Sequence, residues 1–191
     1  MKRVCVYAAS SSKVKDSYYK AALLLGEVLA ANNITTVYGG GSIGLMGALA
    51  EGVLQNNGKI IGIIPEFMME LEWGNRKVEL VVVQDMPQRK QKFLENVDAV
   101  IALPGGTGTL EELAEVLSMK KLALFTKPII IINTDGFYNQ LIAFLERMVS
   151  DSFMRPEHMQ VFTVIDTPDQ LLEAFQNAPA WSKDAIEIAG L

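Results

Sequence analysis

Residues 99–117, AVIALPGGTGTLEELAEVL, decide the expected fold. The apolar run Ala99–Leu103 is typical of a buried strand, a glycine-rich turn follows it, and apolar residues at helical spacing follow the turn. Residues 36–54, TVYGGGSIGLMGALAEGVL, show the same order of strand, glycine cluster and helix. The likeness is too weak to indicate a repeat fold, but it predicts two glycine-rich loops at one edge of a single sheet.

Strand-like and helix-like segments alternate along the rest of the chain. Strands are expected at Val4–Ala8, Ile34–Tyr38, Lys59–Ile64, Val78–Val83, Ala99–Leu103, Pro128–Ile132 and Val161–Ile165. Helices are expected at Tyr18–Ala31, Leu45–Leu54, Gln88–Asn96, Leu110–Phe125, Tyr138–Val149 and Pro168–Phe175, with a less regular stretch at 66–77. This alternation of apolar strands with amphipathic helices indicates βαβ units and a buried, mostly parallel sheet. We predict one Rossmann-like α/β domain over residues 1–177, with helices on both faces of the sheet, and a C-terminal tail over 178–191.

Composition excludes several classes of protein. With 17 basic and 22 acidic residues the net charge is −5, which argues against a nucleic-acid polymer as partner but not against a single nucleotide. The single cysteine, Cys5, rules out an intrachain disulfide, and the single histidine, His158, rules out two-histidine metal sites. Apolar runs fall well short of the roughly 18 residues of a membrane helix. We expect a cytoplasmic protein that needs no metal or organic cofactor and does not bind membranes.

The loop at 104–109, PGGTGT, is the first candidate for ligand binding. In parallel sheets, ligands bind beyond the carboxyl ends of the strands, and this loop follows such a strand. Glycines allow backbone N–H groups to approach a ligand, the threonines offer hydroxyls, and the following helix adds its positive end. The alternative is a tight turn in which Thr109 caps the helix. Because two such loops share one edge, we favour anion binding by Gly105, Gly106, Thr107, Gly108 and Thr109.

The other glycine loop formally fits the dinucleotide fingerprint through Gly39, Gly41 and Gly44. However, it follows the second strand rather than the first, and a dinucleotide site would leave the loop at 104–109 without a role. Neither loop has the Gly-Lys-Ser/Thr sequence of a Walker A motif. Gly40, Gly41 and Gly44 are therefore candidate contacts for a smaller ligand. Ser10, in the polar segment after the first strand, is another candidate anion donor, although for any one such serine the pattern favours an ordinary polar loop.

Two charged pairs follow strands at the same edge. Glu111 and Glu112 occupy the first helical turn after the loop at 104–109, where acidic residues commonly offset the helix dipole. One of the two would nevertheless point at the ligand and could bind ribose hydroxyls or activate water. Arg89 and Lys90 begin the helix after the strand at 78–83, an unfavourable place for cations. They are either a solvated charged face or ligand contacts.

The irregular stretch at 66–77 contains bulky apolar residues, Met68, Met69 and Trp73. These form either the apolar wall of a base pocket or a contact between subunits. Glu72 lies in the same stretch and could reach a ribose.

Three segments together resemble one family: GGGSIGLMG at 39–47, MPQRK at 86–90 and PGGTGTLEE at 104–112. They resemble the Lonely guy (LOG) family, long labelled possible lysine decarboxylases, from Tyr7 to about Leu172. The resemblance implies a phosphoribohydrolase that cleaves cytokinin riboside 5′-monophosphates, and often AMP, into free base and ribose 5-phosphate. It also implies a homodimer.

The resemblance implies roles for individual residues. Arg89 and Glu112 match the paired functional residues of the family, and residues 105–109 would hold the 5′-phosphate. Glu72 matches an upstream substrate glutamate, and Lys90 belongs to the same basic segment as Arg89. The chain departs from the family pattern at Ala8, Ala9, Asn75, Pro87, Met119 and Lys121. Among these, Asn75 and Lys121 are the departures expected to affect base preference.

Cleavage of an N-glycosidic bond passes through an oxocarbenium-like ribosyl group. We expect Glu112 to bind ribose hydroxyls and to position or deprotonate water, and Arg89 to hold substrate charge and assist the departing base. Two alternatives remain. One is a pyridoxal-phosphate decarboxylase using Lys90, and the other is a non-catalytic nucleotide or cofactor carrier on the same fold. A carboxylate beside a phosphate site favours the enzyme, because a pure phosphate binder gains nothing from it.

Overall fold

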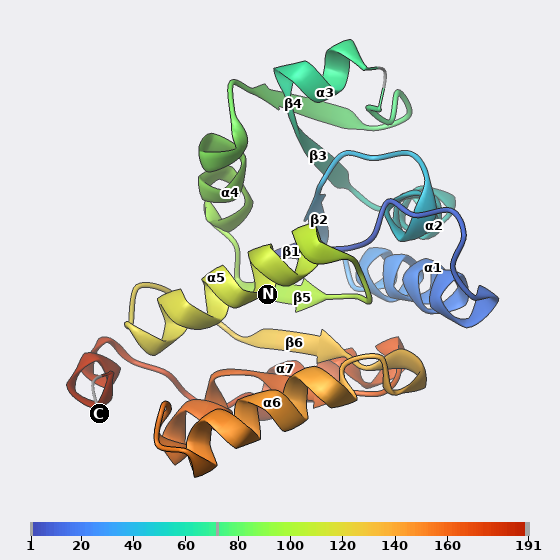
Figure 1. The fold of residues 1–191 in the computed structure, drawn as a ribbon. Coiled ribbons are helices and arrows are strands. Elements are labelled where there is room, and N and C mark those ends of the chain that lie inside the picture. Colours follow the sequence, from blue (N-terminus) through green and yellow to red (C-terminus); the bar gives the residue numbers. More distant parts are fainter. Residues whose placement is uncertain (1, 72, 190–191) are drawn as a thin grey trace.

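Seven parallel strands form one sheet in the computed structural model, which describes residues 2–71 and 73–189 (Figure 1). The strands are β1 (Arg3–Tyr7), β2 (Thr35–Tyr38), β3 (Ile60–Pro65), β4 (Glu79–Val83), β5 (Ala99–Ala102), β6 (Ile129–Ile132) and β7 (Thr163–Ile165). Their order across the sheet is β4-β3-β2-β1-β5-β6-β7, and the paired strands run parallel. The predicted α/β fold is therefore confirmed.

Helices cover both faces of this sheet. One face carries α1 (Asp16–Ala31), α2 (Gly44–Gln55) and α7 (Leu171–Asn177), and the other carries α4 (Met86–Leu94), α5 (Thr107–Lys121) and α6 (Asn139–Ser150). Each layer buries an apolar stripe at helical spacing, as Leu25 and Leu29 do in α1 and Leu113 and Val116 do in α5. The strands between the layers are apolar on both sides, and β5 and β6 are buried along their whole length.

Several elements differ in their bounds from the prediction, and two of the differences lie beside the site. The helix expected from Leu110 begins at Thr107, and its N-cap is Gly106 without a side-chain cap, so Thr109 does not cap it. The stretch expected to be irregular contains a short helix, α3 (Glu66–Glu70), directly after Pro65. Glu66 in the first turn favours such a helix start, because its carboxylate offsets the helix dipole.

The strand order reverses beside β1, which lies between β2 and β5. The chain leaves β1 toward α1 on one face and leaves β5 toward α5 on the other, so the two loops separate and leave a crevice beyond the strand ends. The tail returns to the α5 layer, where Trp181 Nε1 donates a hydrogen bond to the carbonyl oxygen of Lys120 at 2.6 Å. Among the described helices, none combines the length and apolar character needed to cross a bilayer.

Candidate active site

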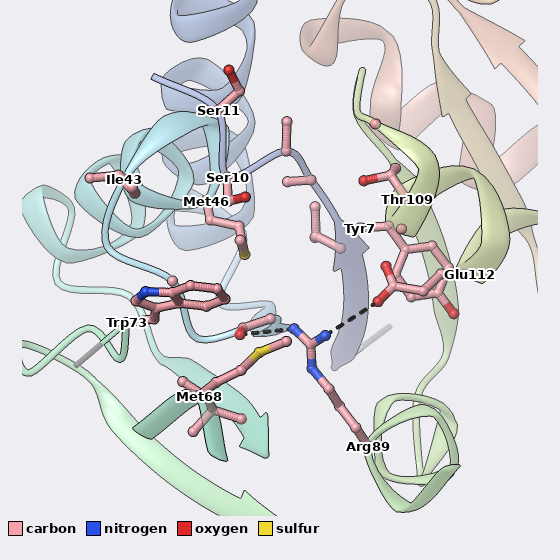
Figure 2. Close-up of a pocket in the computed structure, with 18 of the residues that line it drawn as sticks. Tyr7, Ser10, Ser11, Ile43, Met46, Met68, Trp73, Arg89, Thr109 and Glu112 are labelled. Atoms are coloured by element: carbon pink, nitrogen blue, oxygen red, sulfur yellow. Dashed lines mark hydrogen bonds and ion pairs between the residues drawn. The ribbon is translucent and has the colours of Figure 1, made fainter. Parts of the chain in front are cut away.

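A pocket of about 640 Å³ opens at this crevice (Figure 2). Its wall is built from the loops after β1 and β2, from the first turns of α4 and α5, and from the segment that follows α3. The structure brings together in its lining most of the residues that the sequence nominated: Ser10, Gly41, Arg89, Gly106, Thr107, Gly108, Thr109 and Glu112. Residues far apart in the chain thus meet where the strand order predicts a ligand site.

Three nominated glycines are not among the described residues that line this pocket. Gly40 has φ +77° and packs against Ile64, whereas Gly44 has φ +64° and packs against the backbone of Ser10. Gly105 approaches Thr109 so closely that a Cβ atom there would lie 2.2 Å from Oγ1. These glycines therefore shape the loops. Glu72, the nominated ribose contact, lies outside the described residues.

Lys90 is also absent from the described pocket lining. Its ammonium lies 2.7 Å from Glu111 Oε1 and 3.2 Å from Glu115 Oε2, so it joins α4 to α5. Hydrogen bonds to Glu111 and then Glu115 raise the pKa of Lys90. A Schiff-base lysine needs the opposite, a desolvated amine with a lowered pKa. This environment argues against Lys90 as the lysine of a pyridoxal-phosphate enzyme.

Arg89 is held rigidly in the wall of the pocket although it is only 7% exposed. Its Nε donates to the carbonyl oxygen of Ile63 at 3.1 Å, and its Nη2 donates to that of Gly39 at 3.0 Å. Gly39 is required there, because a Cβ atom would lie 2.5 Å from Nη2. Burial lowers the pKa of Arg89, and the Glu112 carboxylate opposes that effect. The side chain is therefore a buried, oriented cation.

Glu112 faces Arg89 across the inner end of the pocket. Its Oε1 lies 3.7 Å from Arg89 Nη1, and its side chain is 11% exposed. Burial raises the pKa of Glu112 to about 7, and the guanidinium of Arg89 partly offsets that rise. A carboxyl group that titrates near neutral pH is suited to general acid–base work. Of the two glutamates in the first turns of α5, Glu112 is thus the one that points to the ligand space.

The first turn of α5 forms an open cradle next to this pair. Added Cβ atoms at Gly106 and Gly108 would meet nothing within 4 Å among the described residues. The protein's own packing therefore does not require glycine at these two positions, in contrast to Gly105. The free N–H groups at the start of a 15-residue helix attract an anion, and side chains there would fill the space that it needs.

An apolar surface forms the opposite wall. Figure 2 shows Met68 and Trp73 on the side away from Glu112, and the guanidinium of Arg89 lies between these two residues and Glu112. The sequence named Met68, Met69 and Trp73 as a base wall or a subunit contact. The structure places Met68 and Trp73 in the pocket, whereas Met69 is not among the described residues that line it. It also adds Met46, which sequence reasoning missed. Met46 belongs to a helical apolar stripe that reads as core, so no local signal distinguished it.

The comparisons with known proteins identify the family of the chain. The profile of the family described as "Possible lysine decarboxylase" matches residues 46–175. A probable cytokinin riboside 5′-monophosphate phosphoribohydrolase from Oryza sativa subsp. japonica is 43% identical over 176 residues, which cover 92% of this chain and 70% of the rice protein. A cytokinin riboside 5′-monophosphate phosphoribohydrolase from Arabidopsis thaliana is 40% identical over 98% of this chain and 88% of its own length. The chain belongs to the LOG family.

Solved structures show the same fold at lower identity. The molybdenum cofactor binding protein from Rippkaea orientalis superposes with a TM-score of 0.70 and 22% identity, covering 92% of this chain and 96% of its own. The molybdenum cofactor carrier protein from Chlamydomonas reinhardtii also gives 0.70, with 18% identity over 93% of this chain and 98% of its own. These similarities establish the shared Rossmann-like architecture.

Of the six positions noted as departures from the LOG pattern, Ala8 and Ala9 line the pocket, and the other four are not among its described lining residues. Pro87 occupies the first turn of α4, where proline is favourable, and Asp85 caps the same helix by accepting a hydrogen bond from Gln88 N at 2.8 Å. Met119 packs against the apolar core. Neither Asn75 nor Lys121 is among the described residues that line the 640 Å³ pocket, so an effect of either on base preference would be indirect.

Proposed function

We propose that this chain hydrolyses the N-glycosidic bond of a nucleoside 5′-monophosphate, a cytokinin riboside 5′-monophosphate or AMP, to free base and ribose 5-phosphate. One observation carries the proposal: the buried Arg89–Glu112 pair shares a pocket with the open glycine-threonine cradle of α5. The names of the LOG relatives support the same activity.

The cradle would bind the 5′-phosphate through Gly106, Thr107, Gly108 and Thr109, with Ser10 and Gly41 on the facing wall. This anchoring fixes the reacting centre, because binding energy from a remote phosphate restricts the position of the ribose. The base would lie against Trp73 and the neighbouring methionines, whose apolar surface suits a purine ring. The ribose then lies between these anchors, within reach of the catalytic pair.

The chemical step divides between the two catalytic residues. The bond between C1′ of the ribose and the base nitrogen breaks, its electron pair goes to the base, and a water oxygen adds to C1′. The Glu112 carboxylate binds the ribose hydroxyls and accepts the proton of that water. The Arg89 cation stabilises the negative charge that develops on the departing base, and the base takes up one proton from solvent in exchange for the proton that Glu112 accepts from water.

The test of the proposed activity is direct. The purified chain is incubated with AMP or with N6-prenylated AMP, and chromatography measures free base and ribose 5-phosphate. Equal amounts of both products are expected from at least one substrate. Tight nucleotide binding without release of base from either substrate would overturn the proposal and support the carrier alternative.

The acidic limb of the pH profile reports on Glu112. Since burial raises its pKa to about 7, the carboxyl is protonated below that pH and cannot accept a proton from water. We expect kcat/KM to rise as the pH increases through about 7 and then to level off. The measurement is kcat/KM from about pH 5.5 to 9 at constant ionic strength. A profile that falls through neutrality would instead assign Glu112 as a general acid.

Gly108→Ala separates ligand binding from stability. The new methyl group enters the open cradle, so we expect KM to rise about tenfold. Because alanine is the better helix former, the free energy of unfolding should rise by about 0.5 to 1 kcal/mol. Steady-state kinetics and urea unfolding measure the two effects. Gly105→Ala is the control, since its Cβ collides with Thr109 and should lower stability; an unchanged KM for Gly108→Ala would contradict the cradle assignment.

We also propose that the chain forms a homodimer and does not bind a nucleic-acid polymer. Apolar side chains at one end of the sheet support the dimer, since Phe67, Leu71 and Trp73 are 45%, 54% and 56% exposed in the single chain. The net charge of −5 argues against binding of a nucleic-acid polymer. Sedimentation equilibrium at several concentrations tests the dimer. The cytoplasmic location expected from the sequence stays a prediction.

A further inference from the structure

A phenylalanine lies under the proposed catalytic arginine. Phe93 follows Arg89 by one turn of α4, so both side chains project from the same face of that helix. The Cζ atom of Arg89 lies 5.0 Å from the centroid of the Phe93 ring, within the range of a cation–π contact. Phe93 is 1% exposed and also lines the pocket. A buried aromatic ring thus contacts the cation to which we assign a role in the reaction.

The remaining contacts of Arg89 show what this ring contributes. The carbonyl oxygens of Ile63 and Gly39 hold two of its nitrogens at the edge of the guanidinium. Those two contacts hold the edge, Nη1 donates to Met86 Sδ at 4.0 Å, and the Phe93 ring lies against the central carbon of the group. Nη1 is then held on the side of Glu112. Without the ring, the group could tilt about its bonds to the two carbonyl oxygens and admit water.

A second aromatic residue completes this support. The ring of Tyr7, at the end of β1, meets that of Phe93 edge to face, with centroids 5.8 Å apart and an interplanar angle of 63°. Tyr7 is 4% exposed and lines the same pocket as Glu112. The two rings therefore form a continuous apolar contact that includes the ring beside Arg89. This contact joins α4 to β1, and both elements contribute to the pocket lining.

We propose that Phe93 is a positioning residue for the reaction: its ring holds the guanidinium of Arg89 in the orientation that faces Glu112 and the substrate. The expected effect on kcat rests on the proposed function. The effect on the orientation of Arg89 does not, because it can be measured in the protein without substrate. The contact is absent from the sequence motifs, since Phe93 reads there as an ordinary core residue of a helix.

Three variants test the proposal. Phe93→Met removes the ring while filling much of its volume, and Phe93→Tyr restores a ring. Phe125→Met is the matched control, because Phe125 is 7% exposed in the same apolar core and is not among the described residues that line the pocket. We expect Phe93→Met to lower kcat by about 3- to 30-fold, with KM changed by less than about threefold. Phe93→Tyr and Phe125→Met should keep kcat within about threefold of the wild type.

Two readouts separate positioning from general loss of structure. The acidic limb of the pH profile should shift in Phe93→Met and stay in place in Phe125→Met, since a tilted guanidinium and admitted water both change the surroundings of Glu112. Nuclear magnetic resonance should show about tenfold faster solvent exchange of the Arg89 Nε–H in Phe93→Met and little change in Phe125→Met.

Unchanged exchange of that proton, or a kcat equal to that of Phe125→Met, would overturn the proposal. If the wild type releases no base, the proposed function fails. The exchange measurement then still decides whether Phe93 holds Arg89.

Discussion

Glu112→Gln should lower kcat for base release by about 10³-fold and leave the fold intact. The substitution keeps the size of the side chain and its hydrogen-bonding capacity but removes the only proton acceptor that we assign to the reaction. General-base contributions of about 10² to 10⁴ are typical of such residues. The residual activity should also lose the acidic limb near pH 7 that we assign to this carboxyl.

The control for this loss is the neighbouring glutamate. Glu111 is 53% exposed and pairs with Lys90 rather than facing the pocket. Glu111→Gln should therefore retain kcat within about fivefold, while both variants show wild-type circular dichroism. A Glu112→Gln variant within tenfold of the wild type would show that water is activated by another group. Comparable losses in both variants would show that the charge of the first helical turns, rather than one carboxylate, supports the reaction.

Arg89→Met should affect activity and stability together. The variant removes the cation that assists the departing base, so we expect kcat to fall by about 10²-fold or more. It also removes the donor to Gly39 and Ile63 and leaves Glu112 buried without its counter-charge. We expect the free energy of unfolding to fall by about 2 to 4 kcal/mol at pH 8.

The stability loss of Arg89→Met should depend on pH in a defined direction. Burial already raises the pKa of Glu112 above its unfolded value, and Arg89 partly offsets that rise, so removing Arg89 raises it further. When the pKa of a carboxyl is higher in the folded state than in the unfolded state, the folded state holds the proton over a wider pH range. The free energy of unfolding is then highest below the unfolded pKa and falls as the pH rises to the folded pKa. Below about pH 7 the Glu112 carboxyl is protonated in both folded proteins, so between pH 5 and pH 9 the stability difference from wild type should stay nearly constant at first and grow only above about pH 7.

Urea unfolding across that range measures this trend. Lys90→Met is the control, because its more exposed ion pairs should contribute about 1 kcal/mol or less at any pH. A stability loss in Arg89→Met that is constant with pH would contradict the assigned coupling between Arg89 and Glu112.

The sequence could predict the sheet and the edge at which the site lies, because these depend on local patterns. Continuous apolar runs such as Ile129–Ile132 identify buried parallel strands, and the glycine turns at 39–41 and 105–108 mark the strand ends. The approach of Arg89 to Glu112 follows from the same logic, since both begin helices after strands of one parallel sheet. The sequence does not predict how the two side chains are oriented toward each other, because that depends on the packing of α4 against α5.

Other features of the site depend on contacts between distant segments. Gly39 looks like part of a nucleotide loop, yet its lack of a side chain makes room for Arg89. Gly40 and Gly44 share the motif but serve the turn itself through positive φ angles. Tyr7 and Phe93 look like core residues because they are core residues, and their meeting behind the catalytic pair requires β1 and α4 to pack together. Periodicity predicts burial without predicting which buried neighbours meet.

The position of the pocket at the reversal of strand order has a thermodynamic consequence. Its wall takes Ser10 and Gly41 from the β1–β2 half of the sheet and Gly106 and Glu112 from the β5 half. A bound ligand therefore spans the joint between the halves and is released when either half unfolds. By linkage, a ligand at a hundred times its dissociation constant adds about 2.7 kcal/mol to the free energy of unfolding. The free energy of unfolding should thus rise with the concentration of any ligand that binds in this pocket.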